Sequence, residues 1–256
     1  FGLQFAGTQT AGLDSNRFEF YVFPRINLQA ELLRRTLAIY GGWDGEVEQN
    51  TLRSLIAEAP QLSLVQQQRL SGSNRGYVGM QGALVGKLQY RLEGSMAFLN
   101  DAVVFQRDTL APLKTVGDAQ LAALQVGYAD NVVRNSLRGE LNIPLKHFTA
   151  STYAQLNAFS GDEFIGREGR VMGAMAHYRI NELSVRTNLK YVGGRYAING
   201  YSLEDYLDWS ASINYEINDH LSASLHGYNL LGHRYQLWEG YYVRGARGLF
   251  TLNYQF

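Results

Sequence analysis

The end of the chain alternates between apolar and polar side chains at every second position, and this alternation constrains the fold more than any other feature. Within residues 244–256, four large apolar side chains share one parity: Phe250, Leu252, Tyr254 and Phe256. The positions between them carry mostly polar side chains. Successive side chains of a β-strand point to opposite faces of the sheet. The segment therefore predicts a strand with one apolar and one mostly polar face.

The same alternation recurs along the whole chain. It is cleanest in residues 207–217, where every second residue from Leu207 is apolar and the residues between are polar. It also marks residues 17–32, where we expect a bulge or break at Pro24 because proline lacks an N–H for the ladder. Residues 121–144 form either one very long strand or two strands divided near residues 129–131. Counted once, they bring the total to about twelve strands in up-and-down order.

The connections between these strands fall into two classes that alternate along the chain. The short ones are residues 32–35, 86–87, 145–147, 181–182 and 218–219. The long ones are residues 12–16, 43–74, 100–120, 159–169, 198–204 and 231–243. Short turns at one end and long loops at the other are typical of a transmembrane β-barrel. Within the second long loop, residues 51–59 predict a short helix or cover.

Composition excludes several other classes of protein. The formal net charge is zero and no long basic run occurs, which argues against a nucleic-acid partner. The absence of cysteine excludes disulfides and thiolate metal sites, and no cofactor is expected. No apolar run reaches the length of about 18 residues that a spanning helix needs, but barrel strands conceal their apolarity in alternation. The 17 Tyr, 12 Phe and 27 Gly against 4 Pro are typical of a β-rich chain.

The two-faced strands permit two interpretations. In a soluble sandwich or barrel the apolar face fills a core, whereas in a membrane barrel it meets lipid and the polar face lines a lumen. The aromatic side chains of the apolar parity gather at two levels, as two interfacial girdles do, which favours the membrane barrel. We then expect the mid-strand charges to face the lumen: Arg25, Arg91, Glu93, Arg138, Glu140, Arg186, Lys190, Asp208 and Glu216.

Catalysis finds little support in the sequence. The chain is similar in size to twelve-stranded outer-membrane phospholipases, and His226 shares the inward parity with Ser222 and Ser224. Nothing around His226 matches the His-x-Ser-Asn-Gly run of those enzymes. The five histidines also lack metal-ligand spacing. The sequence therefore predicts no enzyme and no metal site.

A specific resemblance lies just before the final strand. Residues Asn229, Leu230, Leu231, Tyr235, Gly245 and Arg247 match a pattern at the carboxy-terminal end of TonB-dependent receptors. In that pattern an Asn-Leu turn, a tyrosine and a Gly-Arg step precede the last strand. The usual Pro-Gly-Arg run is replaced here by residues 244–247. Residues 40–55 resemble an outer loop of such receptors from Bacteroidetes-like bacteria.

This resemblance implies a location and a set of partners. It places the chain in the bacterial outer membrane, as a single barrel segment over residues 1–256 without a plug domain. Family members have about twenty-two strands around a plug and take up nutrients with energy from TonB. The implied partners are lipid and lipopolysaccharide, the barrel assembly machinery, and a plug domain and TonB acting through residues outside this chain. A surface lipoprotein is a further candidate partner.

Two alternatives stay open at this stage. The about twelve strands either join strands outside this chain or close on themselves, and we favour the first because open edges in lipid are costly. A chain without a plug would act as a structural subunit of an envelope assembly or as a passive pore.

The resemblance also directs attention to the chain end and the long loops. In the family, the assembly machinery recognises an ending such as Phe250, Leu252, Tyr254 and Phe256. Binding groups concentrate on loops held by a rigid wall. The loops 43–74, 100–120 and 231–243 are therefore the expected ligand-binding segments, with four aromatic contacts: Trp43, Trp238, Tyr241 and Tyr242.

Overall fold

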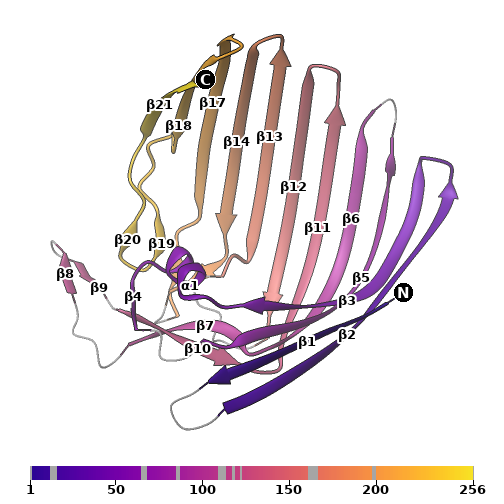
Figure 1. The fold of residues 1–256 in the computed structure, drawn as a ribbon, viewed down its shortest axis with the longest axis vertical. Coiled ribbons are helices and arrows are strands. Elements are labelled where there is room, and N and C mark those ends of the chain that lie inside the picture. Colours follow the sequence, from indigo (N-terminus) through magenta and orange to yellow (C-terminus); the bar gives the residue numbers. More distant parts are fainter. Residues whose placement is uncertain are drawn as a thin grey trace.

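The computed structural model describes residues 2–11, 16–64, 68–84, 87–108, 114–116, 119–121, 123–160, 167–197 and 200–255. Its main feature is one antiparallel sheet of twelve strands that curves into a trough (Figure 1). The sheet order is β1-β2-β3-β5-β6-β11-β12-β13-β14-β17-β18-β21, so each strand pairs with the next of these in the sequence. The predictions of an all-β fold and of up-and-down order are confirmed.

The strands of this sheet have the following bounds: β1 Gly2–Ala11, β2 Asn16–Leu33, β3 Leu37–Gln49, β5 Leu70–Ala83, β6 Gln89–Asn100, β11 Val132–Pro144, β12 Phe148–Phe159, β13 Arg170–Ile180, β14 Leu183–Gly193, β17 Tyr206–Asn218, β18 Leu221–Tyr228 and β21 Arg247–Tyr254. Figure 1 shows the short turns at one end of the trough and the longer connections at the other. Strands β1 and β21 end the sheet order, and the described residues record no pairing between them. The predicted Phe1 and Phe256 lie outside the described residues.

The two parities of the strands face different surroundings. The register aligns residues of like parity across the sheet, as in Val78↔Gly94 and Gly94↔Leu137. Apolar side chains of this parity are exposed on one face, among them Leu28, Val78, Leu137, Ile213, Phe250, Leu252 and Tyr254. The opposite parity carries the polar side chains. Where the structure describes side-chain burial, from Val22 onward, the apolar face of the sheet therefore carries exposed side chains from β2 to β21.

Two sequence predictions about strand bounds are wrong, and one open alternative is decided. Strand β3 continues to Gln49 and β5 begins at Leu70, so the connection predicted as 43–74 is shorter than expected. The predicted loop 100–120 contains β7 (Ala102–Arg107). Of the two alternatives for residues 121–144, two strands divided near residues 129–131 is confirmed: β10 (Leu124–Ala129) and β11 are separated by Asn131, which has a φ of 57°. The left-handed backbone at this asparagine reverses the chain and takes β10 out of the main sheet.

Pro24 does not break β2. Its register with β1 is continuous, with Leu3↔Pro24 among the pairs. The β2–β3 ladder begins only at Ile26, so β2 is paired on one side at Pro24. A strand tolerates a missing N–H where one side is free of a ladder. The predicted bulge at Pro24 is therefore wrong, and the register shift of the β2–β3 ladder lies between Glu31 and Leu33.

The long connections build small elements of their own. The predicted short helix is α1 (Leu52–Glu58). Thr51 caps its N-terminus, since its side chain accepts a hydrogen bond from the Ser54 N–H at 3.1 Å. Strands β4 (Leu62–Leu64), β10 and β7 form a three-stranded sheet. The two-stranded sheets are β8 (Lys114–Val116) with β9 (Ala119–Leu121), β15 (Arg195–Tyr196) with β16 (Ser202–Leu203), and β19 (Gln236–Trp238) with β20 (Tyr241–Tyr242).

These elements share a compact apolar cluster, which we call the loop-end core: Leu55, Ala59, Val103, Phe105, Leu124 and Trp238. Its members come from α1, β7, β10 and β19, which lie together at the long-connection end in Figure 1. We call the assembly of these elements the loop-end cap. In the described part of the chain, no helix has the length and apolarity to cross a membrane.

Leu55→Ala should loosen the loop-end cap without unfolding the sheet. Leu55 is 2% exposed, and removing such a side chain costs about 2–5 kcal/mol. Amide hydrogen exchange should therefore accelerate in α1 and β7 and stay unchanged in β11 to β14. Leu52→Ala is the matched control, because Leu52 is exposed on the same helix. Equal effects of the two substitutions would contradict the loop-end core.

Candidate functional site

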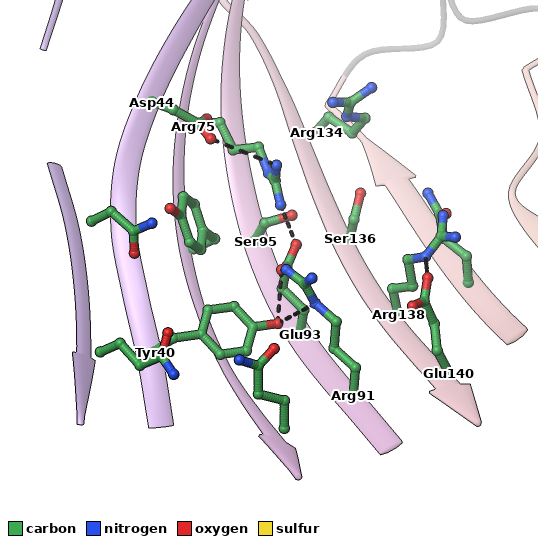
Figure 2. A pocket seen from close by; sticks show the side chains of 15 residues that line it. Tyr40, Asp44, Arg75, Arg91, Glu93, Ser95, Arg134, Ser136, Arg138 and Glu140 are labelled. Atoms are coloured by element: carbon green, nitrogen blue, oxygen red, sulfur yellow. Dashed lines mark hydrogen bonds and ion pairs between the residues drawn. The ribbon is translucent and has the colours of Figure 1, made fainter. Parts of the chain in front are cut away.

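A continuous polar groove runs along the concave face of the sheet. Its middle part is a cavity of about 600 Å³ lined by β2, β3, β5, β6, β11 and β12 (Figure 2). This cavity shares Arg134 and Gln155 with a second cavity under the loop-end cap. It shares Arg91 and Glu140 with a third cavity toward the short turns. The three cavities therefore join the two ends of the sheet.

Glu93 is the centre of the polar network in the middle cavity. Tyr40 donates its hydroxyl proton to Glu93 Oε2 at 2.9 Å, and Arg91 donates to the same oxygen at 2.8 Å. Arg75 pairs with the other carboxylate oxygen, Oε1. Arg91 also donates to the Tyr40 hydroxyl at 2.7 Å. The Glu93 side chain is only 11% exposed, and two cations with one hydroxyl compensate its buried charge.

A glycine makes this network possible. Tyr40 on β3 and Glu93 on β6 are separated by Gly79 of β5, which is in register with both. A Cβ at Gly79 would lie 2.5 Å from the Tyr40 ring and 2.6 Å from the Leu92 carbonyl oxygen. Only the missing side chain lets the tyrosine ring lie across β5 and reach Glu93.

The same arrangement occurs a second time. Tyr153 on β12 lies over Gly173 of β13, where a Cβ would approach the ring to 2.3 Å. An arginine stacks on each tyrosine: Arg91 is 4.7 Å from the Tyr40 ring centroid and Arg138 is 5.0 Å from that of Tyr153. Cation–π stacking and cross-strand contact thus fix these inward side chains.

The remaining charges that the sequence assigned to the lumen form local pairs or lie apart. Arg138 Nε donates to Glu140 Oε1 at 2.5 Å, and both residues line the middle cavity. Lys190 pairs at 2.8 Å with Glu168, a residue of the cavity under the cap. Arg179 lies 3.5 Å from Glu216. The other three are Arg25, exposed on β2, Arg186, in register with His177 and Ser212, and Asp208, in register with Lys190.

One arginine fastens the loop-end cap to the wall of the groove. Arg167 pairs with Glu58 of α1 at 2.5 Å and donates to the Val103 carbonyl of β7 at 3.1 Å. Its guanidinium lies 5.8 Å from the Phe105 ring centroid. Burial raises the pKa of Glu58, and the charge of Arg167 acts in the opposite direction. Nothing in the sequence distinguished Arg167 from other loop arginines.

The four aromatic residues expected to contact ligand have different surroundings. Trp43 lies in β3, so its predicted loop position is wrong, and its ring stacks on Phe98 of the apolar parity at 6.2 Å. Trp238 is 9% exposed, packs edge-on against Phe105 at 5.0 Å and donates its indole N–H to the Glu58 carbonyl. Tyr241 packs on the loop-end core, and Tyr242 is exposed. Of these four, only Tyr242 presents an uncovered ring.

Residues of the sequence motif before the last strand hold the final connection in place. Asn229 has a φ of 46° and donates to the carbonyls of His233 at 2.8 Å and Arg244 at 3.0 Å. Tyr235 stacks on Tyr206 with ring centroids 3.9 Å apart. Burial, with a contribution from the Asp208 charge, raises the pKa of Tyr235 to about 12. The motif therefore has a structural role in this chain.

A buried arginine supports the same connection. Arg195 is 2% exposed, donates to the carbonyls of Gln236, Leu237 and Glu204, and stacks on Tyr206 at 4.7 Å. Burial lowers the pKa of this guanidinium. Among the described residues, no group of three His, Asp or Glu side chains lies close enough to hold a metal ion.

Comparisons with known proteins agree with this architecture. Neither protein-family models nor curated protein sequences give a match. Solved structures do: a mutant of the ferric enterobactin receptor PfeA from Pseudomonas aeruginosa matches with a TM-score of 0.61 at 15% identity, over 93% of this chain and 40% of that one. The siderophore receptor PiuA from Acinetobacter baumannii matches with a TM-score of 0.63 at 12% identity, over 98% and 40%. The copper transporter OprC matches with 0.59 at 13%, over 96% and 41%.

These structures are TonB-dependent outer-membrane receptors, and the chain has the fold of one part of their barrel wall. At these identities the likeness concerns the fold alone. The chain spans about two fifths of the length of the structures it matches.

Gly79→Ala should displace Tyr40 and weaken the network around Glu93. The added methyl group meets both a ring and a backbone oxygen, and such overpacking costs about 1–3 kcal/mol of the free energy of unfolding. Gly94→Ala is the matched control, because a Cβ there has no atom within 4 Å. Thermal unfolding in detergent should separate the two variants. If Gly79→Ala is as stable as Gly94→Ala, the close approach of Tyr40 is wrong.

Proposed function

We propose that this chain forms part of the wall of a transport barrel in the bacterial outer membrane. The observation that carries the proposal is the two-faced sheet: an uncovered apolar face opposite a continuous polar groove. Apolar side chains exposed over so wide an area require lipid, because water does not stabilise such a surface. The likeness to receptor barrels supports the same assignment.

In this proposal, residues 1–256 form one barrel segment that pairs with further strands through β1 and β21. Unpaired strand edges cost several kcal/mol per group in lipid, which favours a larger barrel over an open sheet. The charges of the polar parity face the lumen, and Phe250, Leu252, Tyr254 and Phe256 serve recognition by the assembly machinery. Lipid, lipopolysaccharide and a surface lipoprotein complete the set of proposed contacts.

The transport itself is proposed to be energised uptake of a scarce nutrient, driven by TonB and gated by a plug domain supplied from outside this chain. The matched structures include receptors whose names refer to ferric enterobactin and other siderophores, and one copper transporter. The proposed nutrient belongs to the siderophore, vitamin or glycan class, and the names of these structures support the siderophore class. A passive pore or a structural subunit is the competing function.

Spin labels test the lipid-facing assignment. The chain has no cysteine, so Leu137→Cys, Ile213→Cys and Leu252→Cys each give one labelling site on the apolar parity. In liposomes, these labels should collide more with oxygen than with a water-soluble nickel complex. Ser136→Cys and Ser212→Cys are the matched neighbours on the polar parity, and their preference should be reversed. Labels shielded from oxygen at all three outer positions would refute the membrane wall.

Energised transport is tested in cells with and without TonB. Uptake of a panel of ferric siderophores and cobalamin should increase when the protein is present, and the increase should disappear without TonB. A passive pore instead gives a TonB-independent increase in the permeability of the membrane to small solutes. That second outcome would reject energised uptake and leave the membrane wall intact.

A further inference from the structure

Arg134 differs from the other arginines of the middle cavity because its side chain has no partner among the described residues. Arg75 pairs with Glu93 and lies 3.9 Å from Asp44, Arg91 pairs with Glu93, and Arg138 pairs with Glu140. The Arg134 side chain makes no hydrogen bond or ion pair with any residue that the structure describes. Figure 2 shows its guanidinium apart from the paired groups.

Arg134 also lies where two of the cavities meet. It lies in β11 and lines both the middle cavity and the cavity under the loop-end cap. Anything that moves between these two parts of the groove therefore passes its guanidinium. The charge of Glu46 acts on Arg134, but the two residues form no ion pair.

The neighbours of Arg134 are arranged as a cradle for an anion. In one row across the sheet, Arg134 and Arg75 lie on either side of Ala97, which is 1% exposed because longer side chains cover it. In the next row, Ser95 and Ser136 lie side by side. Ser136 donates to Asn157 Oδ1 at 2.8 Å, which leaves its oxygen free to accept, whereas the Ser95 hydroxyl makes no hydrogen bond with the described residues. The cradle therefore offers two guanidinium groups and a free hydroxyl donor.

The geometry and charge of the Arg134 guanidinium group indicate which class of ligand it can bind. An arginine presents its N–H groups in a planar fork that fits carboxylate and phosphate oxygens, and the charge is permanent. A partly buried arginine has lost part of its hydration. A bound anion compensates for that loss with charge-assisted hydrogen bonds. The chain has compensated every other arginine of the middle cavity with a carboxylate.

We propose that Arg134, with Arg75 and Ser95, forms an anion-binding subsite for a carboxylate or phosphate group of the cargo. The subsite deepens the proposed function, on which it rests, by specifying an anionic cargo. The fork of Arg134 holds two oxygens of the anion, Ser95 donates to it, and Arg75 contributes charge while it stays paired with Glu93.

Titration calorimetry on the purified protein in detergent tests the subsite, with citrate and inorganic phosphate as the probes and glucose as the neutral control. At least one anion should bind and glucose should not, and the anion that binds identifies the group. Arg134→Gln should weaken binding about tenfold or more, the range expected for a hydrogen-bonded charge. Arg134→Lys keeps the charge without the fork and should give an intermediate affinity.

Arg186→Gln is the matched control, since Arg186 lies at mid-strand in β14 on the same parity but outside the middle cavity. It should leave the affinity unchanged. Equal weakening by Arg186→Gln and Arg134→Gln would overturn the subsite in favour of a general lumen charge. Binding unaffected by Arg134→Gln, or no binding of either anion to the native protein, would overturn it too.

The outcome is separable from that of the proposed function. Spin-label accessibility and TonB-dependent uptake report on the wall and on transport, whereas calorimetry reports on Arg134 alone. Uptake of a neutral cargo together with absent anion binding would reject the subsite and keep the transport function. Thermal unfolding of Arg134→Gln should match that of the native protein, because the substitution breaks no side-chain hydrogen bond or ion pair with the described residues.

Discussion

Inter-strand backbone pairing is the constraint on which the rest of this structure depends. The inner strands of the large sheet pair their N–H and C=O groups with a neighbour on each side, so the two sets of side chains can face different surroundings. Because the side-chain period is two, one register decides both faces at once. The same hydrogen-bond register therefore produces both the uncovered apolar face and the polar groove. Neither face requires a packed interior.

The polar face carries long charged side chains, whose positions have to be fixed by contacts with their neighbours. In this sheet, two tyrosine rings hold charged side chains in place. Tyr40 and Tyr153 lie flat over Gly79 and Gly173, and an arginine stacks on each ring. Glu93 then ties three strands together through Tyr40, Arg91 and Arg75. Several contacts thus hold the side chains in the middle of the groove, whereas the Arg134 side chain has no partner among the described residues.

Periodicity predicted the strands, their order and the side of the short turns, because each depends only on residues close in sequence. It failed where tertiary pairing overrides local pattern: β3 runs on to Gln49 because β5 offers a partner, and β10 leaves the main sheet to pair with β7. The roles of Gly79, Arg167 and Trp238 depend on residues far away in the chain. A single sequence carries no signal for such contacts. The aromatic residues assigned to ligand therefore included Trp238 and Tyr241, which pack in and on the loop-end core, and Trp43, which stacks on Phe98.

The contact between Trp238 and Glu58 joins positions 180 residues apart, and the same cluster includes Phe105 from a third connection. Loops of most proteins accept insertions and replacements one at a time. Here a substitution in one connection alters the packing of the other two. The three connections at this end of the sheet therefore have to change together during evolution. Related sequences should accordingly show these segments varying together or not at all.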